Sequence, residues 1–234
     1  MMDLTQATEQ SGQTLSTSIA GTLRAAISNG ELAPGSKLRL DELRVMFGVS
    51  LSPLREALSR LSAEGFVVME DQRGYRVAPI SAENLDEVTK LRAMVETFAL
   101  RESIQNGDDK WEGEVVASLY RLNKLEKVED PADRRAWEGA HRDLHYRLIS
   151  ACRMSLLLAF SSTLHDLNDR YRRLFLAARP FDKSVRREHT EIVNAALERN
   201  ADVACRIMRE HIERTGANIR KALLKNEAPL RQAA

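Results

Sequence analysis

Histidine is the residue whose spacing in this sequence points most directly to chemistry. Four of the five imidazoles fall on the apolar side of their predicted helices: His141, His145, His189 and His211. Two of them, His141 and His145, are four residues apart, so one helix face can present both to the same ion. Four inward imidazoles from three helices predict a shared metal site rather than four separate core residues. The fifth, His165, aligns with polar residues, and we expect it to lie outside this group.

The chemistry of the predicted site follows from its ligand type. A site made only of nitrogen ligands favours Zn²⁺ or Ni²⁺ over Mg²⁺ or Ca²⁺. An ion with an open coordination position can bind a carboxylate, as a Lewis acid would. Two alternatives stay open, a metal sensor and a metal-dependent enzyme. Against the enzyme, we assign no carboxylate beside the cluster as a general base, because Glu188 adjoins His189 in the chain but should face another way.

Arg92 and Glu96 are one helical turn apart, close to an apolar stripe. One interpretation is a surface pair at i, i+4, which stabilises a helix by a few tenths of a kcal/mol. The other is an effector site, in which Arg92 reaches a pocket and binds an acidic metabolite. The sequence favours neither interpretation, and we keep both residues as candidate effector-binding residues.

Six helices must position these side chains. Their apolar periodicity predicts helices over residues 82–105, 110–127, 133–152, 154–178, 184–199 and 201–225. Short connections between them imply an antiparallel all-α bundle. The sequence therefore predicts a helical domain over residues 80–226, followed by a tail at 227–234.

A different organisation is predicted before residue 80. A turn with Gly48 and Ser50 follows a helix over 41–47, and Ser52-Pro53 opens a second helix. That second helix turns one apolar face inward, with leucines at i, i+4 and i+7. This spacing is typical of a helix-turn-helix, whose second helix enters the DNA major groove. A helix over 15–29 and a turn over 32–38 precede it, and a β-hairpin wing over 66–77 follows. We expect a mobile arm at 1–14 and a DNA-binding domain at 15–79.

Composition limits the partners and the compartment. The chain has 234 residues, 43% hydrophobic and 29% charged, with a formal net charge of +1. Because acidic residues slightly outnumber basic ones before residue 80, DNA affinity must come from local clustering and from two copies acting together. Cys152 and Cys205 are too few for a disulfide framework, which indicates a reducing compartment. With no membrane-length apolar run and no secretory signal, we expect a cytoplasmic protein without membrane contact.

The motifs of the first eighty residues resemble the winged helix-turn-helix of the GntR family of bacterial transcription regulators. The matching residues are Gly30-x-Leu32-x-Pro34-Gly35-x-x-Leu38, Phe47-Gly48-Val49-Ser50, Pro53-Leu54-Arg55-Glu56-Ala57-Leu58, Glu64-Gly65-Phe66 and Arg73-Gly74-Tyr75-Arg76-Val77. The remaining residues resemble the all-helical effector domain of the FadR branch, in the six-helix form of the VanR group. This resemblance implies a homodimer that binds a palindromic operator, most simply as a repressor, under the control of a small organic acid.

The resemblance also implies roles for individual residues. Arg55 stands where the family contacts DNA, and Gly74 stands where the wing meets the groove. Leu51 replaces an arginine that the family usually has, so the base specificity should differ. The complete set of candidate DNA-binding residues is Arg55, Ser50, Ser52, Pro53, Arg44, Arg60, Arg73, Gly74 and Tyr75. In the family's metal site, His145, Glu188-His189 and His211 match the usual positions, while His141 replaces an aspartate. That replacement either gives an all-nitrogen site or weakens the site.

Overall fold

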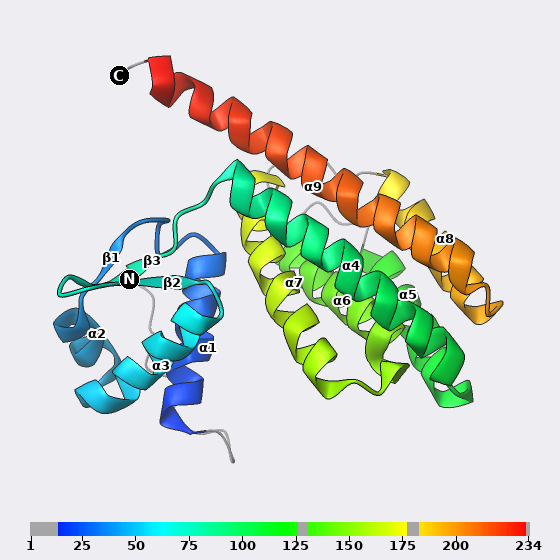
Figure 1. Ribbon diagram of the computed structural model, residues 1–234, viewed down its shortest axis with the longest axis horizontal. Helices are drawn as coiled ribbons and strands as arrows, with labels where there is room; N and C mark the ends of the chain where they lie inside the picture. Colours follow the sequence, from blue (N-terminus) through cyan, green and yellow to red (C-terminus); the bar gives the residue numbers. More distant parts are fainter. Residues whose placement is uncertain (1–13, 126–130, 177–182, 233–234) are drawn as a thin grey trace. The chain divides into compact units, whose positions relative to one another are not determined.

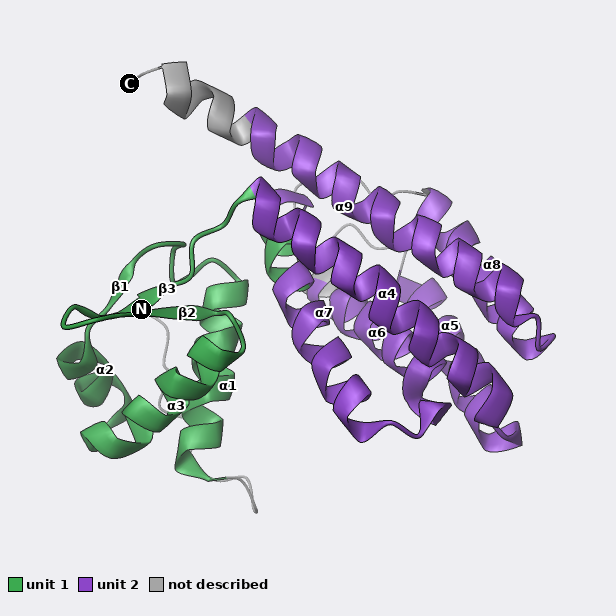
Figure 2. Cartoon of the chain, viewed as in Figure 1, with its two compact units in different colours: residues 1–81, 169–174 green, residues 82–168, 175–234 purple. Residues whose placement is uncertain are grey.

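The computed structural model describes residues 14–125, 131–176 and 183–232, without the side chains of residues 131–134, 183 and 226–232 (Figure 1). Its elements in chain order are α1 (Leu15–Ser28), β1 (Lys37–Leu38), α2 (Leu40–Phe47), α3 (Leu51–Ala63), β2 (Val67–Glu70), β3 (Gly74–Val77), α4 (Ala82–Asn106), α5 (Asp109–Leu125), α6 (Pro131–Ile149), η2 (Ser150–Cys152), α7 (Ser155–Leu176), α8 (Lys183–Leu197) and α9 (Ala201–Gln232). The chain divides into two compact units (Figure 2). Unit 1 is residues 1–81 with 169–174, and unit 2 is residues 82–168 with 175–234.

The helix-turn-helix of unit 1 is α2, a short turn and α3. Gly48 ends α2 in the left-handed conformation, with φ 63°, which glycine adopts without steric cost. The next helix begins at Leu51 with Ser50 in the capping position, so the predicted start at Ser52-Pro53 was slightly late. Pro53 fits in the first turn because backbone N–H groups there have no partner inside the helix. Leucines 54, 58 and 61 are fully buried, which confirms the predicted inward face.

A small antiparallel sheet completes unit 1, in the strand order β1-β3-β2. The predicted wing is confirmed as β2 and β3, with Glu70 opposite Gly74 at the tip. The predicted turn over 32–38 was wrong at its end, because Lys37 and Leu38 form β1 and pair with Arg76 and Tyr75. Two residues are too short to show the alternation by which a strand is identified in a sequence.

Unit 2 is the predicted helical bundle, and all six predicted helices are present. In it, α4 packs along α9, α9 also packs along α8, and α5 packs along α6. The core they enclose includes Leu100, Val115, Leu144 and Met208, all essentially inaccessible to solvent. The last helix continues to Gln232, past the predicted end at residue 225, so the expected tail at 227–234 begins within a helix. The predicted arm at 1–14 lies almost wholly outside the described residues.

Within residues 14–125, 131–176 and 183–232, no helix combines the length and the apolar character that spanning a bilayer requires.

Candidate functional site

Arg55 lies on the solvent face of α3, opposite the buried leucines of the same helix. Among the described residues its guanidinium has neither a hydrogen bond nor an ion pair. An exposed arginine that makes no contact within its own protein keeps all five N–H donors for a partner. The geometry is therefore the one that a DNA-contacting arginine requires.

The other predicted DNA-binding arginines differ in how far they are already engaged. Arg44 and Arg73 are exposed and, within the described part of the chain, their side chains are unpaired. Arg60 instead donates to Thr17 Oγ1 at 2.9 Å and lies 3.9 Å from Glu56. An engaged guanidinium must break these contacts before it meets a phosphate. The structure thus ranks Arg60 below Arg44 and Arg73 as a phosphate ligand.

The uncharged candidates of unit 1 lie around the same surface. Ser50, Leu51 and Ser52 are exposed at the start of α3, and Pro53 and Tyr75 are half-buried. Gly74 has φ 88°, a conformation that side-chain-bearing residues rarely adopt, and a Cβ there would meet no atom. Glycine at this position is therefore explained by the backbone of the wing turn rather than by a lack of space.

The four predicted histidine ligands converge inside unit 2. One ring nitrogen from each of His141, His145, His189 and His211 lies within 4.8 Å of the others, and all four side chains are buried. His141 and His145 come from α6, His189 from α8 and His211 from α9. Trp137, one turn before His141, stacks on its ring at a centroid distance of 4.9 Å. The prediction that three helices bring these imidazoles together is confirmed as geometry.

Glu96 fixes the orientation of His145. Its Oε2 lies 3.0 Å from His145 Nδ1. Burial raises the pKa of Glu96, but the neighbouring Arg92 guanidinium and hydrogen bonds from His145 and His165 outweigh burial and hold that pKa well below its usual value. An ionised carboxylate only accepts hydrogen bonds, so His145 Nδ1 must carry the proton. Burial also lowers the pKa of His145 to about 4, although Glu96 opposes this shift. At neutral pH the ring is therefore neutral, with its lone pair on Nε2.

Glu188 fixes the orientation of His211 in the same way. Its Oε2 lies 2.8 Å from His211 Nδ1 and accepts a hydrogen bond from Arg214 at 2.6 Å. Burial lowers the pKa of His211 to about 4, and Glu188 partly offsets this. We assigned no carboxylate beside the cluster as a general base, and the partners of Glu188 are the His211 ring and the Arg214 guanidinium. Glu188 on α8 reaches Nδ1 of His211 on α9, the ring nitrogen that faces away from the cluster.

These features fit a metal ion that prefers nitrogen ligands. His145 Nε2 is buried and has no hydrogen-bond partner among the described residues, which is costly unless another group binds it. Histidines that bind metals usually donate their second N–H to a carboxylate or carbonyl, as His145 and His211 do here. The donor set therefore has both the ligands and the outer hydrogen bonds of a zinc-type site.

Arg92 and Glu96 are not a surface pair. Their side chains are 3% and 1% exposed, and Arg92 Nε donates to Glu96 Oε1 at 2.7 Å. His165, which we expected on a polar face apart from the cluster, is also buried and lies 3.3 Å from Arg92 through its Nδ1. Glu96, His145 and His165 would by themselves form a second metal-sized group. Because the Arg92 guanidinium already supplies a cation to this group, a second metal site there is unnecessary.

A small cavity adjoins this network. It measures about 30 Å³, and its lining includes Glu96, His145, His165, Arg142, Ser161 and Ser162. Arg142 is paired with Asp166 and donates to Ser162 Oγ at 2.8 Å. Arg142 is not among the predicted site residues, although it precedes His145 by three residues and so shares its helix face. The cavity has room for water but not for an organic acid, so an effector needs it to widen.

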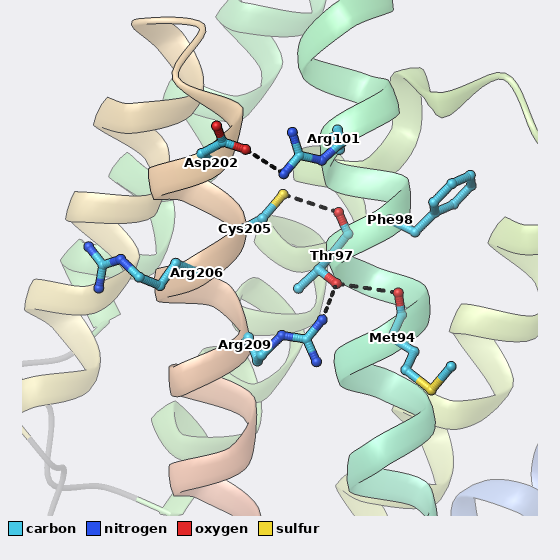
Figure 3. Close-up of a pocket in the computed structure, with 8 residues that line it drawn as sticks. All are labelled: Met94, Thr97, Phe98, Arg101, Asp202, Cys205, Arg206 and Arg209. Atoms are coloured by element: carbon cyan, nitrogen blue, oxygen red, sulfur yellow. Dashed lines mark hydrogen bonds and ion pairs between the residues drawn. The ribbon is translucent and has the colours of Figure 1, made fainter.

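A larger and more open groove of about 550 Å³ lies between α4 and α9 (Figure 3). Arg101 pairs with Asp202 across it at 2.7 Å, and Cys205 Sγ lies 3.2 Å from the Thr97 carbonyl oxygen. Met94 and Phe98 point outward from α4 on the far side (Figure 3). None of the groups that line this groove belongs to the histidine cluster, so we treat it as a separate surface feature.

Comparison with protein families separates the same two parts of the chain. Residues 15–77 match the family described as bacterial regulatory proteins, gntR family. Residues 87–214 match the FCD domain. The first range covers the helix-turn-helix and wing, and the second holds the whole histidine cluster together with Arg92, Glu96 and Glu188.

Individual proteins give the same picture. The chain is 38% identical to the uncharacterized HTH-type transcriptional regulator BphR of Paraburkholderia xenovorans, over 85% of this chain and 82% of that one. It is 32% identical to the transcriptional repressor GlaR of Escherichia coli, over 81% and 89% of the two chains. Among solved structures, McbR of Escherichia coli superposes with a TM-score of 0.76 at 18% identity, covering 90% of this chain and 99% of that one. These relatives are regulators, and none of these names describes an enzyme.

Proposed function

Because the chain belongs to the GntR family of bacterial transcriptional regulators and carries an FCD domain, we propose that it is a cytoplasmic repressor that binds a palindromic operator as a homodimer and answers to a small organic acid. The DNA-binding part of this proposal depends on Arg55, which is exposed on α3 and whose side chain has no hydrogen bond or ion pair with the described residues. Repression is supported by the relative GlaR, which is named a repressor.

Two copies are needed because one α3 helix reads only one half-site. Each copy presents a single family-type arginine on this helix, and acidic residues balance the basic ones in this part of the chain. Two-fold symmetry doubles the base contacts and matches a palindromic site. In the proposed complex Arg55 contacts base edges, while Arg44, Arg73 and, after release from Thr17, Arg60 contact phosphates.

The metal part of the proposal places Zn²⁺ or Ni²⁺ on His141, His145, His189 and His211. Such an ion, when bound, would act as a Lewis acid, and it could take a carboxylate as a further ligand by raising its coordination number above four. Arg142 lines the adjoining cavity, and Arg92 contacts two of its lining residues, Glu96 and His165, so these arginines are the proposed cationic groups for an acidic effector. The proposed effector must widen the 30 Å³ cavity. It must also bind more tightly to one arrangement of the two DNA-binding domains of the dimer, because equal affinity for both arrangements would not change their populations.

Selection of DNA from a random library by the full-length protein tests the proposed function. We expect enrichment of one palindromic sequence, with an affinity that falls steeply as salt rises, because phosphate contacts release counterions. Failure to enrich any sequence, or an affinity that does not change with salt, would contradict the DNA-binding proposal.

Elemental analysis tests the metal centre. The purified protein should retain about one Zn²⁺ or Ni²⁺ ion per chain, and His145→Ala or His211→Ala should lose it. Retention of the ion by both variants would exclude the four-histidine site.

The histidine cluster also supports a second candidate, in which the ion itself is the signal. DNA affinity should then depend on added metal in protein that holds no organic ligand. If the metal-free and metal-loaded forms bind the selected operator equally, the ion has a structural or effector-binding role instead.

A further inference from the structure

Two histidines of the cluster each contact a glutamate, and each of these glutamates also contacts an arginine. One chain of contacts runs His145–Glu96–Arg92, and the other runs His211–Glu188–Arg214. We propose that Glu96 is a positioning residue that links occupancy of the metal centre to the Arg92 guanidinium, whereas Glu188 only orients its histidine. This inference rests on the proposed metal centre and states how that centre communicates with the effector cavity.

The two glutamates use their oxygens differently. Glu96 contacts its partners with different oxygens: Oε2 lies 3.0 Å from His145 Nδ1, and Oε1 accepts from Arg92 Nε at 2.7 Å. Glu188 holds both His211 and Arg214 with the same atom, Oε2. Glu96 therefore presents a separate oxygen to each of its two partners, whereas the two partners of Glu188 share one oxygen.

The two series of contacts differ more strongly in how deeply their side chains are buried. Glu96 is 1% exposed and Arg92 is 3% exposed, while the side chains of Glu188 and Arg214 are 15% and 31% exposed. Charges interact more strongly inside the protein than next to water, where solvent screens them. A change of charge at His145 is therefore felt at Arg92, and a similar change at His211 is largely screened before it affects Arg214.

The link then follows from elementary hydrogen-bond chemistry. With a cation on Nε2, the Nδ1–H of His145 becomes a stronger donor and holds the Glu96 carboxylate more tightly. Glu96 Oε1 then has less negative charge to share with Arg92 Nε, so the guanidinium is more available to an anion. Arg92 also contacts His165, which lines the 30 Å³ cavity. Occupancy of the metal centre thus changes how strongly the wall of the cavity attracts a carboxylate, and linkage makes this effect reciprocal.

Titration of the metal-free full-length protein with Zn²⁺ alone tests the link, with the ¹⁵N–¹H signal of Arg92 Nε as a direct readout. In the unchanged protein this signal should shift as the site fills. Glu96→Gln keeps the shape but removes the charge, and it should lower Zn²⁺ affinity by about 10- to 100-fold. At saturating Zn²⁺ the Arg92 signal of this variant should then stay where it was.

Two variants serve as matched controls. Glu188→Gln makes the same change in the His211–Glu188–Arg214 contacts. It should also weaken Zn²⁺ binding, but the Arg92 signal should still shift at saturating Zn²⁺. Asp202→Asn removes a carboxylate that pairs with Arg101, a different arginine of α4, and that has no hydrogen bond or ion pair with a histidine of the described residues (Figure 3). It should leave both Zn²⁺ affinity and the Arg92 shift unchanged.

The outcomes separate this inference from the proposed metal centre. If the unchanged protein does not bind Zn²⁺, the metal centre is wrong and the link fails with it. If the protein binds Zn²⁺ but the Arg92 signal does not move, or if Glu96→Gln binds and shifts normally, the link alone is wrong. The first of these measurements needs no variant, so the inference stays testable even if Glu96→Gln does not fold.

Discussion

Two helices of this protein carry the same pair of opposite charges one turn apart, in very different surroundings. On α3, in the DNA-reading unit, Glu56 and Arg60 are 3.9 Å apart, with side chains 62% and 40% exposed. On α4, in the helical unit, Arg92 and Glu96 are 2.7 Å apart and almost inaccessible. Residue type and spacing are alike, so the difference comes from what packs around each helix.

The comparison explains where each unit keeps its charge. On the helix-turn-helix and wing, the side chains of Arg44, Arg55 and Arg73 are exposed and have no hydrogen bond or ion pair with the described residues, so a partner must supply the opposite charge. The charges beside the histidine cluster of unit 2 are instead paired within the protein, Arg92 with Glu96 and Arg214 with Glu188. One unit is therefore built to gain an anionic partner from outside, and the other to change an internal network. The following predictions test this contrast, beginning with the largest expected effect.

Removal of the outward arginine should abolish specific DNA binding. Arg55→Ala deletes one base-reading side chain from each subunit, and each such contact contributes roughly 1–3 kcal/mol to discrimination. Over two half-sites the loss is about 2–6 kcal/mol, measurable by fluorescence anisotropy with the selected operator. Arg187→Ala, an exposed arginine on α8, is the control and should bind normally. Normal affinity in Arg55→Ala with an unchanged circular dichroism spectrum would refute the contact.

Removal of the buried arginine should damage the fold instead. Arg92→Ala leaves the Glu96 carboxylate buried without its main cation, a change that typically destabilises a protein by about 3–5 kcal/mol. Urea denaturation of the metal-free protein measures this loss. The double variant Arg92→Met, Glu96→Gln should recover part of the stability, because no charge is then left unpaired. A loss below about 1 kcal/mol for Arg92→Ala would mean that burial does not distinguish the two pairs.

Local features of the fold were accessible from the sequence because neighbouring residues determine them. Gly48, the buried leucines of α3 and the wing turn at Gly74 act through their own backbone or helix face, and each was predicted close to its true place. The two-residue strand β1 was missed, since it forms only by pairing with β3. The inward positions of the four histidines were likewise visible as helical periodicity.

The partners of those histidines could not be predicted in the same way. Glu96 meets His145 from a position 49 residues away, and Glu188 meets His211 across 23 residues. These contacts depend on how α4, α8 and α9 pack, and periodicity gives a buried face without naming the facing residue. For the same reason, nothing in the spacing of Arg92 and Glu96 distinguished a buried pair from a surface pair.

Acidic pH should destabilise the metal-free helical unit. Burial lowers the pKa values of His145 and His211 in the folded protein to about 4, below the value of 6.5 for an exposed imidazole. Between these two values the unfolded chain binds more protons, so the free energy of unfolding falls as pH drops from 6.5 and levels off below about 4. The loss is on the order of 3 kcal/mol per histidine. Urea denaturation at pH 7.5 and 5 measures the part of this loss that falls above pH 5, which is about 2 kcal/mol per histidine.

Two comparisons sharpen the pH prediction. A variant with both histidines replaced by asparagine should lose much of the dependence in this window. Bound Zn²⁺ should make the dependence steeper, since protons compete with the ion for the same nitrogens. Equal stability of the metal-free protein at pH 7.5 and 5 would contradict the assignment of two neutral buried imidazoles.

The smallest effect is expected at the exposed pair of α3. Arg60→Ala removes a weak ion pair and a hydrogen bond to Thr17, and surface interactions of this kind contribute about 0–1 kcal/mol. Because its guanidinium is already engaged, the variant should also weaken operator binding far less than Arg55→Ala does. Parallel measurements of unfolding and anisotropy check both statements. A loss of DNA affinity equal to that of Arg55→Ala would show that the contact between Arg60 and Thr17 opens when DNA binds. The contacts of an arginine in the free protein would then not predict how much it contributes to DNA affinity.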